Sequence, residues 1–382
     1  MTNAASGGFP AGIYVHLPYC RSRCEYCSFV VSTDERSRAS YLACLERESA
    51  LVAPEAEGFP FDSVYLGGGT PSLTPAEDLV LLIARLRDRF DIAAGSEITM
   101  EANPDDVTAS RVEAWGSAGV NRISLGVQSF SDRELAAVGR RHDADGARAA
   151  LQALQSAGLS FSGDLILGLP EQTGESFLRS AEELAASGAA HVSVYLLETE
   201  KSRAIEEDRR ARPERYLSDD AQADLWLELG RRLESAGFAH YEISNWARPG
   251  FEARHNLKYW QRVPTLGLGV SAHELWAGRR RANVGSLTGY IEALESGRRP
   301  TALDRRLSSE EEAREGVMLG LRLAAGIDAG ELEALVAEGS DRELAADYRA
   351  WREEGLLEER SDRVAFTERG FLLSNEILCR FV

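Results

Sequence analysis

Three cysteines, Cys20, Cys24 and Cys27, lie within eight residues in the spacing CxxxCxxC. The chain has 5 cysteines in 382 residues, and three at any one chosen spacing are expected by chance in roughly one chain per thousand. An odd cysteine count and such close packing do not suit a disulfide scaffold. Metal ligation is the better interpretation, and it leaves Cys44 and Cys379 as isolated thiols.

Three thiolates can hold three of the irons of a [4Fe–4S] cluster, whereas clusters that only carry electrons usually have four cysteines. The remaining iron then lacks a protein ligand and becomes a site for chemistry. The alternative is a zinc knot, which needs a fourth ligand. His16 is the only histidine nearby, and it lies inside an apolar, strand-like run. Zinc is therefore the weaker interpretation.

The elements that must position these cysteines alternate between strands and helices. Short β-branched runs predict strands at residues 13–17, 63–66, 97–101, 122–127, 162–167 and 191–196. Amphipathic segments predict helices at residues 75–89, 108–118, 145–157 and 174–186. This alternation predicts βα units and a parallel sheet. Six consecutive units suit either a partly closed barrel or an open, doubly wound sheet.

Polar residues at the ends of successive strands favour the barrel. The cysteines follow the first predicted strand, Gly67-Gly-Gly-Thr-Pro71 the second and Glu101-Ala-Asn-Pro104 the third, while Gln128 follows the fourth and Asp164 lies in the fifth. Strand C-termini meet at one face of a barrel, where its active sites lie. We therefore expect an α/β fold, a partial (β/α)6 TIM-like barrel over residues 11–240, after a short tail at residues 1–10.

The pattern changes after the barrel. Residues 202–215 are charged and turn-like, 221–236 predict a helix, and 241–300 form a connecting segment with strand-like runs at 241–244 and 265–271. Residues 301–382 predict a mostly helical, winged-helix-like domain, with helices at 309–323, 328–337, 342–354 and 368–380 and a β element at 364–367. A packing role suits this domain better than DNA binding, because acidic residues outnumber arginines in it.

Net charge and the distribution of apolar residues exclude further classes of function. The formal net charge is −18, which argues against bulk affinity for nucleic acid. The run Arg279-Arg-Arg281 is best interpreted as a solvated arginine cluster. The sequence has no apolar run long enough to span a membrane and no secretory signal pattern, so we expect a cytoplasmic protein.

The cysteine spacing, with Tyr26 before the last cysteine, resembles the radical S-adenosylmethionine (SAM) superfamily, in which the open iron chelates the methionine moiety of SAM. A finer resemblance, to the HemN/HemW family of proteins similar to oxygen-independent coproporphyrinogen oxidase, covers nearly the whole chain. It rests on Tyr14-Val-His-Leu-Pro-Tyr-Cys20, Gly67-Gly-Gly-Thr-Pro-Ser72, Glu101-Ala-Asn-Pro104, Ser124-Leu-Gly-Val-Gln-Ser-Phe130, Gly139-Arg-Arg-His142 and Asp164-Leu-Ile-Leu-Gly-Leu-Pro170.

This resemblance implies which residues hold the cofactors. Cys20, Cys24 and Cys27 would bind the [4Fe–4S] cluster, and Tyr14, Gly68 and Glu101 would contact the SAM molecule bound to it. A second group matches positions that hold another SAM molecule in oxygen-independent coproporphyrinogen oxidase: Tyr26, Gly69, Thr70, Gln128, Arg140 and Asp164. Without the resemblance, ion pairs with arginines would explain the presence of Glu101 and Asp164 as well as a binding role does.

Two departures within the family bear on function. The oxidase has a further cysteine two residues after the third, where this chain has Phe29, and it has a longer N-terminal extension. The motif His255-Asn-Leu-Lys-Tyr-Trp260 resembles the HNxxYW signature of the branch that binds heme and passes it to hemoproteins such as respiratory enzymes. A neutral imidazole is a good heme ligand, so His255 is the expected ligand, with His191, His240 and Cys379 as alternatives. The alternative role for the motif is packing between barrel and C-terminal domain.

We therefore expect a heme chaperone that carries a SAM-binding [4Fe–4S] cluster and lacks coproporphyrinogen oxidase activity. The alternative is an oxygen-independent coproporphyrinogen III oxidase, which decarboxylates propionates to give protoporphyrinogen IX. A third possibility is an acidic binding module without radical chemistry. The expected partners are heme and acceptor hemoproteins, with a homodimer and peripheral membrane association as further expectations, and no nucleic acid.

Overall fold

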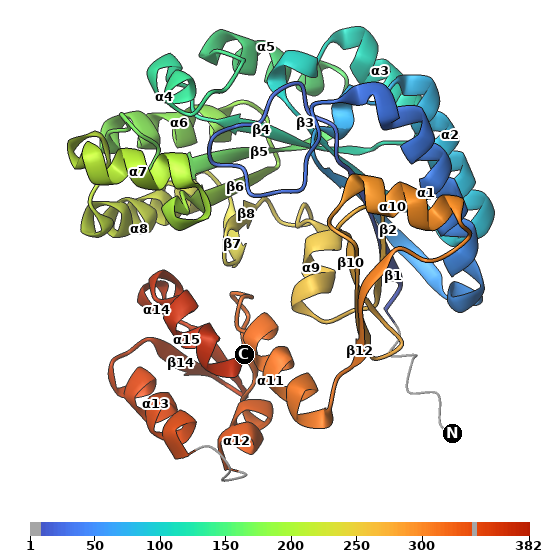
Figure 1. Ribbon diagram of the computed structural model, residues 1–382. Coiled ribbons are helices and arrows are strands. Elements are labelled where there is room, and N and C mark those ends of the chain that lie inside the picture. Colours follow the sequence, from blue (N-terminus) through green and yellow to red (C-terminus); the bar gives the residue numbers. More distant parts are fainter. Residues whose placement is uncertain (1–8, 338–341) are drawn as a thin grey trace.

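The computed structural model describes residues 9–337 and 342–382 and shows an α/β core with a smaller C-terminal unit below it (Figure 1). Most of the expected N-terminal tail, residues 1–8, lies outside the described residues. Within the described part of the chain, no helix is both long and apolar enough to cross a membrane.

Six parallel strands form the centre of the core. They are β1 (Ala11–Leu17), β2 (Pro60–Gly68), β3 (Asp91–Ala102), β4 (Arg122–Gln128), β5 (Ser160–Leu167) and β6 (His191–Leu196). Each strand pairs with the next in chain order. A doubly wound sheet would reverse its strand order at a switch point, so this order confirms the partial barrel.

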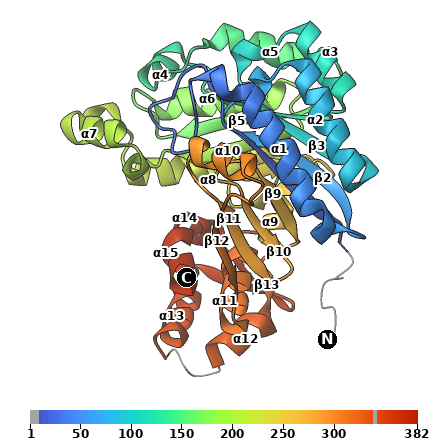
Figure 2. The ribbon, with the colours of Figure 1, turned by 45° about the vertical axis from the view of Figure 1, so that its right-hand side comes forward.

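Helices cover the outer face of these strands (Figures 1 and 2). They are α1 (Arg38–Val52), α2 (Ala76–Arg89), α3 (Ala109–Ala118), α4 (Asp132–Ala137), α5 (Ala144–Ser156), α6 (Gly174–Ala186) and α8 (Asp219–Ser235). In α5 the buried residues Ala147, Ala150, Leu151 and Leu154 follow the helical repeat. The apolar stripe predicted from the sequence is therefore the face that packs on the sheet.

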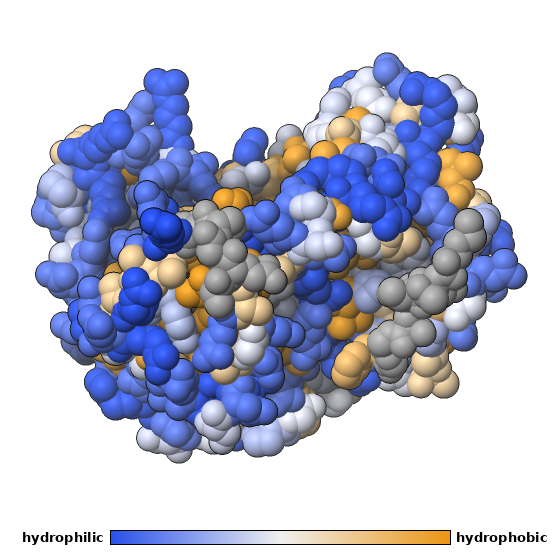
Figure 3. All heavy atoms as spheres, turned by 90° about the horizontal axis from the view of Figure 1, so that it is seen from below, coloured by the Kyte–Doolittle hydropathy of each residue, from blue (hydrophilic) through white to orange (hydrophobic). Residues whose placement is uncertain are grey.

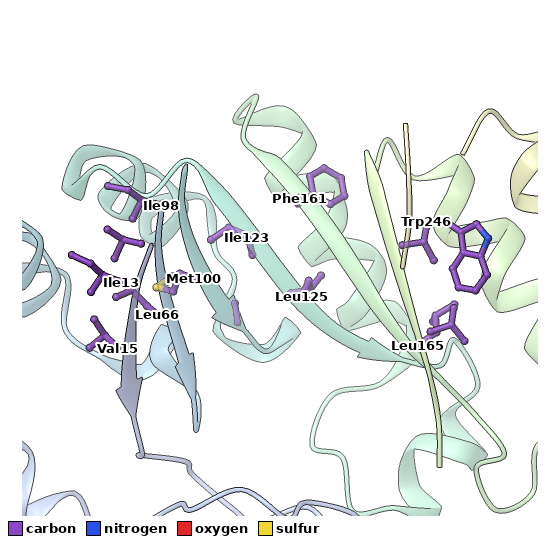
Figure 4. Close-up of a cluster of buried hydrophobic side chains, with 14 of the residues drawn as sticks. Ile13, Val15, Leu66, Ile98, Met100, Ile123, Leu125, Phe161, Leu165 and Trp246 are labelled. Atoms are coloured by element: carbon purple, nitrogen blue, oxygen red, sulfur yellow. The ribbon is translucent and has the colours of Figure 1, made fainter. Parts of the chain in front are cut away.

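The apolar core lies between the strands and the helices that cover them, whereas the opposite face of the sheet carries polar groups such as Ser124 and Asp164. Six of the seven residues of β4 are buried, as expected for a parallel strand covered on both faces. Figure 4 shows side chains from neighbouring strands in this core, among them Ile13, Leu66, Met100 and Leu125. This packing holds the strand ends, and therefore the loops that follow them, in fixed positions.

The sheet continues beyond both edges of the barrel. On one edge, β9 (Thr265–Leu268) pairs parallel to β1 and is followed by β10 (His273–Trp276), β11 (Arg279–Asn283) and β12 (Thr301–Arg306). On the other, β8 (Asn245–Ala247) pairs with β6, and β7 (Ala239–Glu242) pairs with β8. Most of the expected connecting segment therefore extends the main sheet, which stays open because β12 and β7 end it on opposite sides.

The expected arginine cluster forms strand β11 and is ion-paired. Arg279 lies 2.6 Å from Asp304, and Arg281 lies 2.9 Å from Glu274. Arg280 lies 2.8 Å from Glu315 of α11 (Ser309–Gly320), which joins the sheet to the C-terminal unit. These carboxylates neutralise the charge of the three arginines. Seen from below, the surface of the molecule is mostly hydrophilic, with scattered apolar areas (Figure 3).

The C-terminal unit combines helices with a small sheet. Besides α11 it contains β13 (Ile327–Asp328), α12 (Ala329–Ala337), α13 (Arg342–Glu353), β14 (Leu357–Arg360), β15 (Arg363–Phe366), α14 (Glu368–Leu372) and α15 (Ser374–Leu378). The expected final helix at 368–380 is therefore two short helices.

Residues 202–215, expected to be turn-like, contain α7 (Arg203–Ala211). Two further helices, α9 (Arg254–Trp260) and α10 (Leu287–Glu295), lie within residues 241–300.

Candidate cofactor and ligand cavity

A cavity of about 520 Å³ opens at the C-terminal ends of the barrel strands, between the barrel and the C-terminal unit. Its size is within the range of small-molecule and cofactor sites. It brings together most of the residues singled out in the sequence: Cys20, Cys24, Cys27, Tyr26, Gly68, Gly69, Thr70, Glu101, Gln128, Arg140 and Asp164. Tyr14 and His255 do not line it.

The three cysteines lie on the loop that follows β1. The Cys20 backbone N–H donates to Ser32 O at 2.9 Å, and the Cys27 N–H donates to Cys24 O at 3.1 Å. The Thr70 hydroxyl donates to Cys20 Sγ at 3.3 Å. All three thiols are free, and burial raises the pKa of Cys20 and Cys27. Binding of metal would therefore have to displace a proton from each buried thiol.

The donor set fits a cluster better than a single metal ion. Within the described residues, no group of three or more His, Cys, Asp or Glu side chains converges as a single ion would require. His16 cannot complete a zinc site as placed, because its ring nitrogens contact the Tyr14 hydroxyl at 3.0 Å and Val30 O at 2.9 Å. In a [4Fe–4S] cluster each thiolate binds a different iron, so three cysteines of one loop that do not converge on a single point suit it.

The glycines after β2 are required by the close approach of β1. Gly68 has φ +107°, and a Cβ there would lie 2.4 Å from the His16 ring. A Cβ at Gly69 would lie 2.6 Å from the carbonyl carbon of Pro18. Only glycine satisfies both demands. The Gly68 backbone N–H is thereby aimed at Glu101, to which it donates at 3.0 Å.

Glu101 is a buried carboxyl group that accepts hydrogen bonds from two donors. Its Oε1 accepts from the Tyr65 hydroxyl at 2.9 Å and its Oε2 from Gly68. Burial nevertheless raises the pKa of Glu101 to about 7. Asp164 accepts from the Ser124 hydroxyl at 3.0 Å, and burial raises its pKa as well. Both groups line the cavity, and neither forms a salt bridge with an arginine among the described residues, although the charges of Arg122 and Arg140 act to lower the pKa of Asp164.

Arg140 connects the cysteine loop with the C-terminal ends of β3 and β4. Its guanidinium donates to Asn103 Oδ1 at 2.7 Å, Gly126 O at 2.7 Å and the Tyr26 hydroxyl at 3.3 Å. The same group lies 3.7 Å from Cys24 Sγ. Sequence reasoning did not single out Asn103, although the motif Glu101-Ala-Asn-Pro104 contained it.

Gln128 ends β4 in the left-handed region, with φ +66°. This conformation is uncommon for a residue other than glycine and marks a position held by its surroundings. The turn of the backbone here places Gln128 in the cavity wall, at the place where a barrel positions ligand-binding residues.

His255 and Tyr14 lie behind the cavity rather than in its wall. His255 is 0% exposed, and its Nδ1 and Nε2 contact the Ser63 hydroxyl and the Tyr259 hydroxyl, each at 3.0 Å. In this arrangement His255 has no free ring nitrogen for iron, so its role as heme ligand stays a prediction that requires one of these bonds to break. The Tyr14 ring stacks on Tyr65 at 6.2 Å and reaches Glu101 only through that neighbour.

The alternative heme ligands differ in their access to the cavity. His191 Nε2 contacts the Tyr241 hydroxyl at 2.8 Å, and Cys379 Sγ donates to Glu376 O at 2.9 Å. His240 Nε2 is buried without a partner. Its ring lies 4.7 Å from the ring of Phe371, and Phe371 lines the cavity. Among the predicted alternatives, His240 and His191 each have one buried ring nitrogen without a hydrogen bond, and His240 is the one whose ring packs against a residue of the cavity wall.

Two family models match the chain. The radical SAM superfamily matches residues 14–184, and the HemN C-terminal domain matches residues 307–373, directly after β12 ends. A heme chaperone HemW from Mycobacterium tuberculosis is 35% identical over 97% of this chain and 94% of its own length. A heme chaperone HemW from Bacillus subtilis is 30% identical over 97% of this chain and 98% of its own. The chain belongs to the HemW family.

Coproporphyrinogen III oxidase (HemN) from Escherichia coli has the same fold, with a TM-score of 0.83 at 24% identity over 97% of this chain and 90% of that one. The radical SAM match confirms the superfamily expected from the cysteine spacing, and with it the [4Fe–4S] cluster and SAM as cofactors. The similarity to HemW proteins along nearly the whole chain agrees with Phe29 and the HNxxYW motif as features of this family.

Proposed function

We propose that this protein binds heme and delivers it to hemoproteins such as respiratory enzymes, while carrying a SAM-binding [4Fe–4S] cluster. The observation that supports this most is the extent of the similarity to heme chaperones, which runs through both the barrel and the C-terminal unit. The cavity lies between these two parts, so the whole of the site belongs to the region of similarity.

The cavity wall suits a large, flat, apolar ligand. Phe29, Tyr195 and Leu196 are 63%, 45% and 48% exposed, and all three line the cavity. Trp226 and Phe371 line it from α8 and α14. Large apolar side chains left exposed inside a concave site indicate a ligand that covers them. A porphyrin offers a flat face for such aromatic contacts.

The cofactor residues follow from the geometry and the resemblance together. Cys20, Cys24 and Cys27 would hold the cluster, which when bound supplies an iron with an open coordination position. Tyr14, Gly68 and Glu101 would contact the SAM molecule bound to this iron. The second set stays a proposal for another bound molecule: Tyr26, Gly69, Thr70, Gln128, Arg140 and Asp164.

The alternative function is decarboxylation of coproporphyrinogen III, as in the oxidase that shares this fold. One residue argues against it: Phe29 occupies the position of the oxidase's further cysteine and presents an exposed apolar ring to the cavity. A homodimer, contact with a membrane surface and a cytoplasmic location stay predictions.

An anaerobic heme titration of the reconstituted protein, read by the Soret band, tests the proposal. Wild type should bind heme to saturation. His255→Ala and His240→Ala separate the two imidazole candidates, with His273→Ala as a control because His273 is exposed on β10. Weakened binding and an altered Soret maximum in one variant alone would identify the ligand. If wild type shows no saturable binding, the chaperone proposal fails, and conversion of coproporphyrinogen III becomes the expected activity.

A further inference from the structure

Arg322 is fixed at the seam between the barrel and the C-terminal unit. It follows α11, and its carbonyl accepts a hydrogen bond from the Ile243 N–H at 2.8 Å. The Ala324 N–H donates to Tyr241 O at 3.0 Å, so this segment pairs with the end of β7 like a short extra strand. The backbone therefore holds the Arg322 side chain in the cavity wall.

The guanidinium of Arg322 lacks an ionic partner. Its Nε is buried without a hydrogen bond, and no carboxylate of a described residue lies within salt-bridge distance of it. The other four arginines of the cavity are engaged. Arg21 lies 3.0 Å from Asp106 and Arg141 lies 3.5 Å from Asp105, while Arg23 donates to Cys27 O and Arg140 donates to Asn103 and Gly126. A partly buried cation without an anion is costly, which makes Arg322 a site where an anionic ligand group would be favoured.

Apolar and aromatic groups surround this cation. The Arg322 guanidinium lies 5.2 Å from the centre of the Trp260 ring, the last residue of the HNxxYW motif. Trp226, Ile243, Phe371 and Leu372 also line the cavity, with the Trp226 and Phe371 rings 6.2 Å apart. The acid whose charge acts on Arg322 is Glu242. Burial raises the pKa of Glu242 to about 7, so it is only partly ionised near neutral pH and neutralises Arg322 incompletely.

We propose that Arg322 binds a carboxylate of the ligand that occupies the apolar side of the cavity. A planar guanidinium is the side chain best matched to a carboxylate. The ligand chemistry is therefore a large apolar body that carries a carboxylate, with Trp260 holding the guanidinium in place. This inference rests on the proposed function, under which the carboxylate is a propionate of heme. The methionine carboxylate of SAM is the other source of the same chemistry.

Binding of heme and of heme dimethyl ester to the reconstituted, full-length protein distinguishes these possibilities. Arg322→Met should weaken heme binding by about tenfold or more, the usual effect of losing a charge-assisted hydrogen bond. The ester should bind wild type and Arg322→Met equally, because it has no carboxylate to lose. SAM affinity should stay unchanged. Arg179→Met, on the exposed surface of α6, serves as the matched control.

Removal of Arg322 could also weaken heme binding indirectly, by leaving Glu242 without its neighbouring positive charge. The comparison is therefore repeated in a Glu242→Gln background, where the tenfold loss should persist. Equal loss of heme and ester binding, or no loss beyond that of Arg179→Met, would overturn the assignment. Loss of SAM binding instead would assign the carboxylate to SAM and overturn the propionate assignment. If wild type binds neither heme nor ester, the proposed function itself fails, and the propionate assignment with it.

Discussion

The His255 ring stacks on the Tyr65 ring with 5.3 Å between their centroids. The Tyr65 hydroxyl in turn donates to Glu101, so one tyrosine connects the HNxxYW motif to the carboxylate expected to bind SAM. The Arg254 and His255 N–H groups both donate to Glu97 at 3.1 Å, which fixes the start of α9 beneath the sheet. The first part of the motif thus supports the cofactor site, whereas Trp260 at its end supports Arg322.

Tyr65→Phe should weaken SAM binding to the reconstituted protein by about threefold to tenfold, because the Glu101 carboxylate loses one of its two hydrogen-bond donors. The stacking on His255 is retained in this variant. Anaerobic calorimetry measures the effect. Tyr290→Phe is the matched control, since the Tyr290 hydroxyl donates to a different buried carboxyl group, Glu48. Equal effects of the two variants would contradict the assigned role of Tyr65.

His255→Ala should lower the free energy of unfolding by about 3 kcal/mol, because it leaves a cavity and removes the partner of two buried hydroxyls. These hydroxyls belong to Ser63 and Tyr259. Urea unfolding followed by circular dichroism provides the measurement. His273→Ala, at an exposed position, should change stability by less than about 0.5 kcal/mol. A similarly small loss in His255→Ala would show that the histidine is not held as described.

SAM affinity should fall as the pH is lowered through about 7, which is the pKa to which burial raises Glu101. Only the ionised carboxylate attracts a cationic group, and below this pKa its ionised fraction falls about tenfold per pH unit. Equilibrium binding between pH 5.5 and 8 tests this. Glu101→Gln should bind SAM weakly at every pH. A wild-type affinity that does not depend on pH would contradict the role of Glu101 as an ionised ligand.

Glu48 should make stability depend on pH in the same range. This buried carboxyl group of α1 accepts hydrogen bonds from the Tyr290 hydroxyl at 2.6 Å, Gly269 N–H at 2.7 Å and Asn283 at 2.5 Å. Burial raises its pKa from the ordinary 4.5 to about 7. The folded state therefore holds a proton that the unfolded state releases. Its contribution to stability is fully present below pH 4.5 and is lost as the pH rises through about 7.

The loss amounts to up to about 3 kcal/mol by linkage. Urea unfolding of wild type and Glu48→Gln at several pH values between 4 and 8 measures it. Other buried carboxyl groups contribute equally to both proteins, so the difference between the two curves isolates Glu48. Parallel curves would show that Glu48 titrates normally.

The six central strands were predictable because β-branched runs and helical stripes alternate in the sequence. The missed elements lack such patterns. Helix α7 buries only Ile205, so it has no apolar stripe, and β11 consists largely of arginines whose charge is neutralised by residues distant in the chain. The division of the final helix at Leu373, a non-helical residue with φ −102° and ψ 11°, is also not marked by proline.

The cavity residues expected to hold the cluster and SAM were predictable because each follows a strand or belongs to a motif. The apolar part of the cavity wall next to the C-terminal unit was not predictable. Trp226, Arg322 and Phe371 meet there only through packing between the barrel and the C-terminal unit, and no local spacing connects them. The environment of His255 was likewise hidden, because Ser63 and Tyr65 lie on β2, far away in the sequence.

Replacement of all three cysteines by alanine should remove iron and SAM binding while the barrel stays folded, because the cysteine loop lies outside the packed core. Iron analysis, SAM binding and circular dichroism after anaerobic reconstitution provide the measurements. A variant without iron that binds SAM as tightly as wild type would contradict the idea that an open iron holds SAM.

Transfer of heme to an acceptor tests the central proposal most directly. The protein is loaded with heme, freed of excess by gel filtration, and mixed anaerobically with increasing concentrations of the apo form of a b-type cytochrome. Delivery through a complex predicts that the transfer rate rises with acceptor concentration and then saturates. A rate that is independent of the acceptor, equal to simple loss of heme to the solvent, would contradict the account and reduce the protein to a passive heme binder.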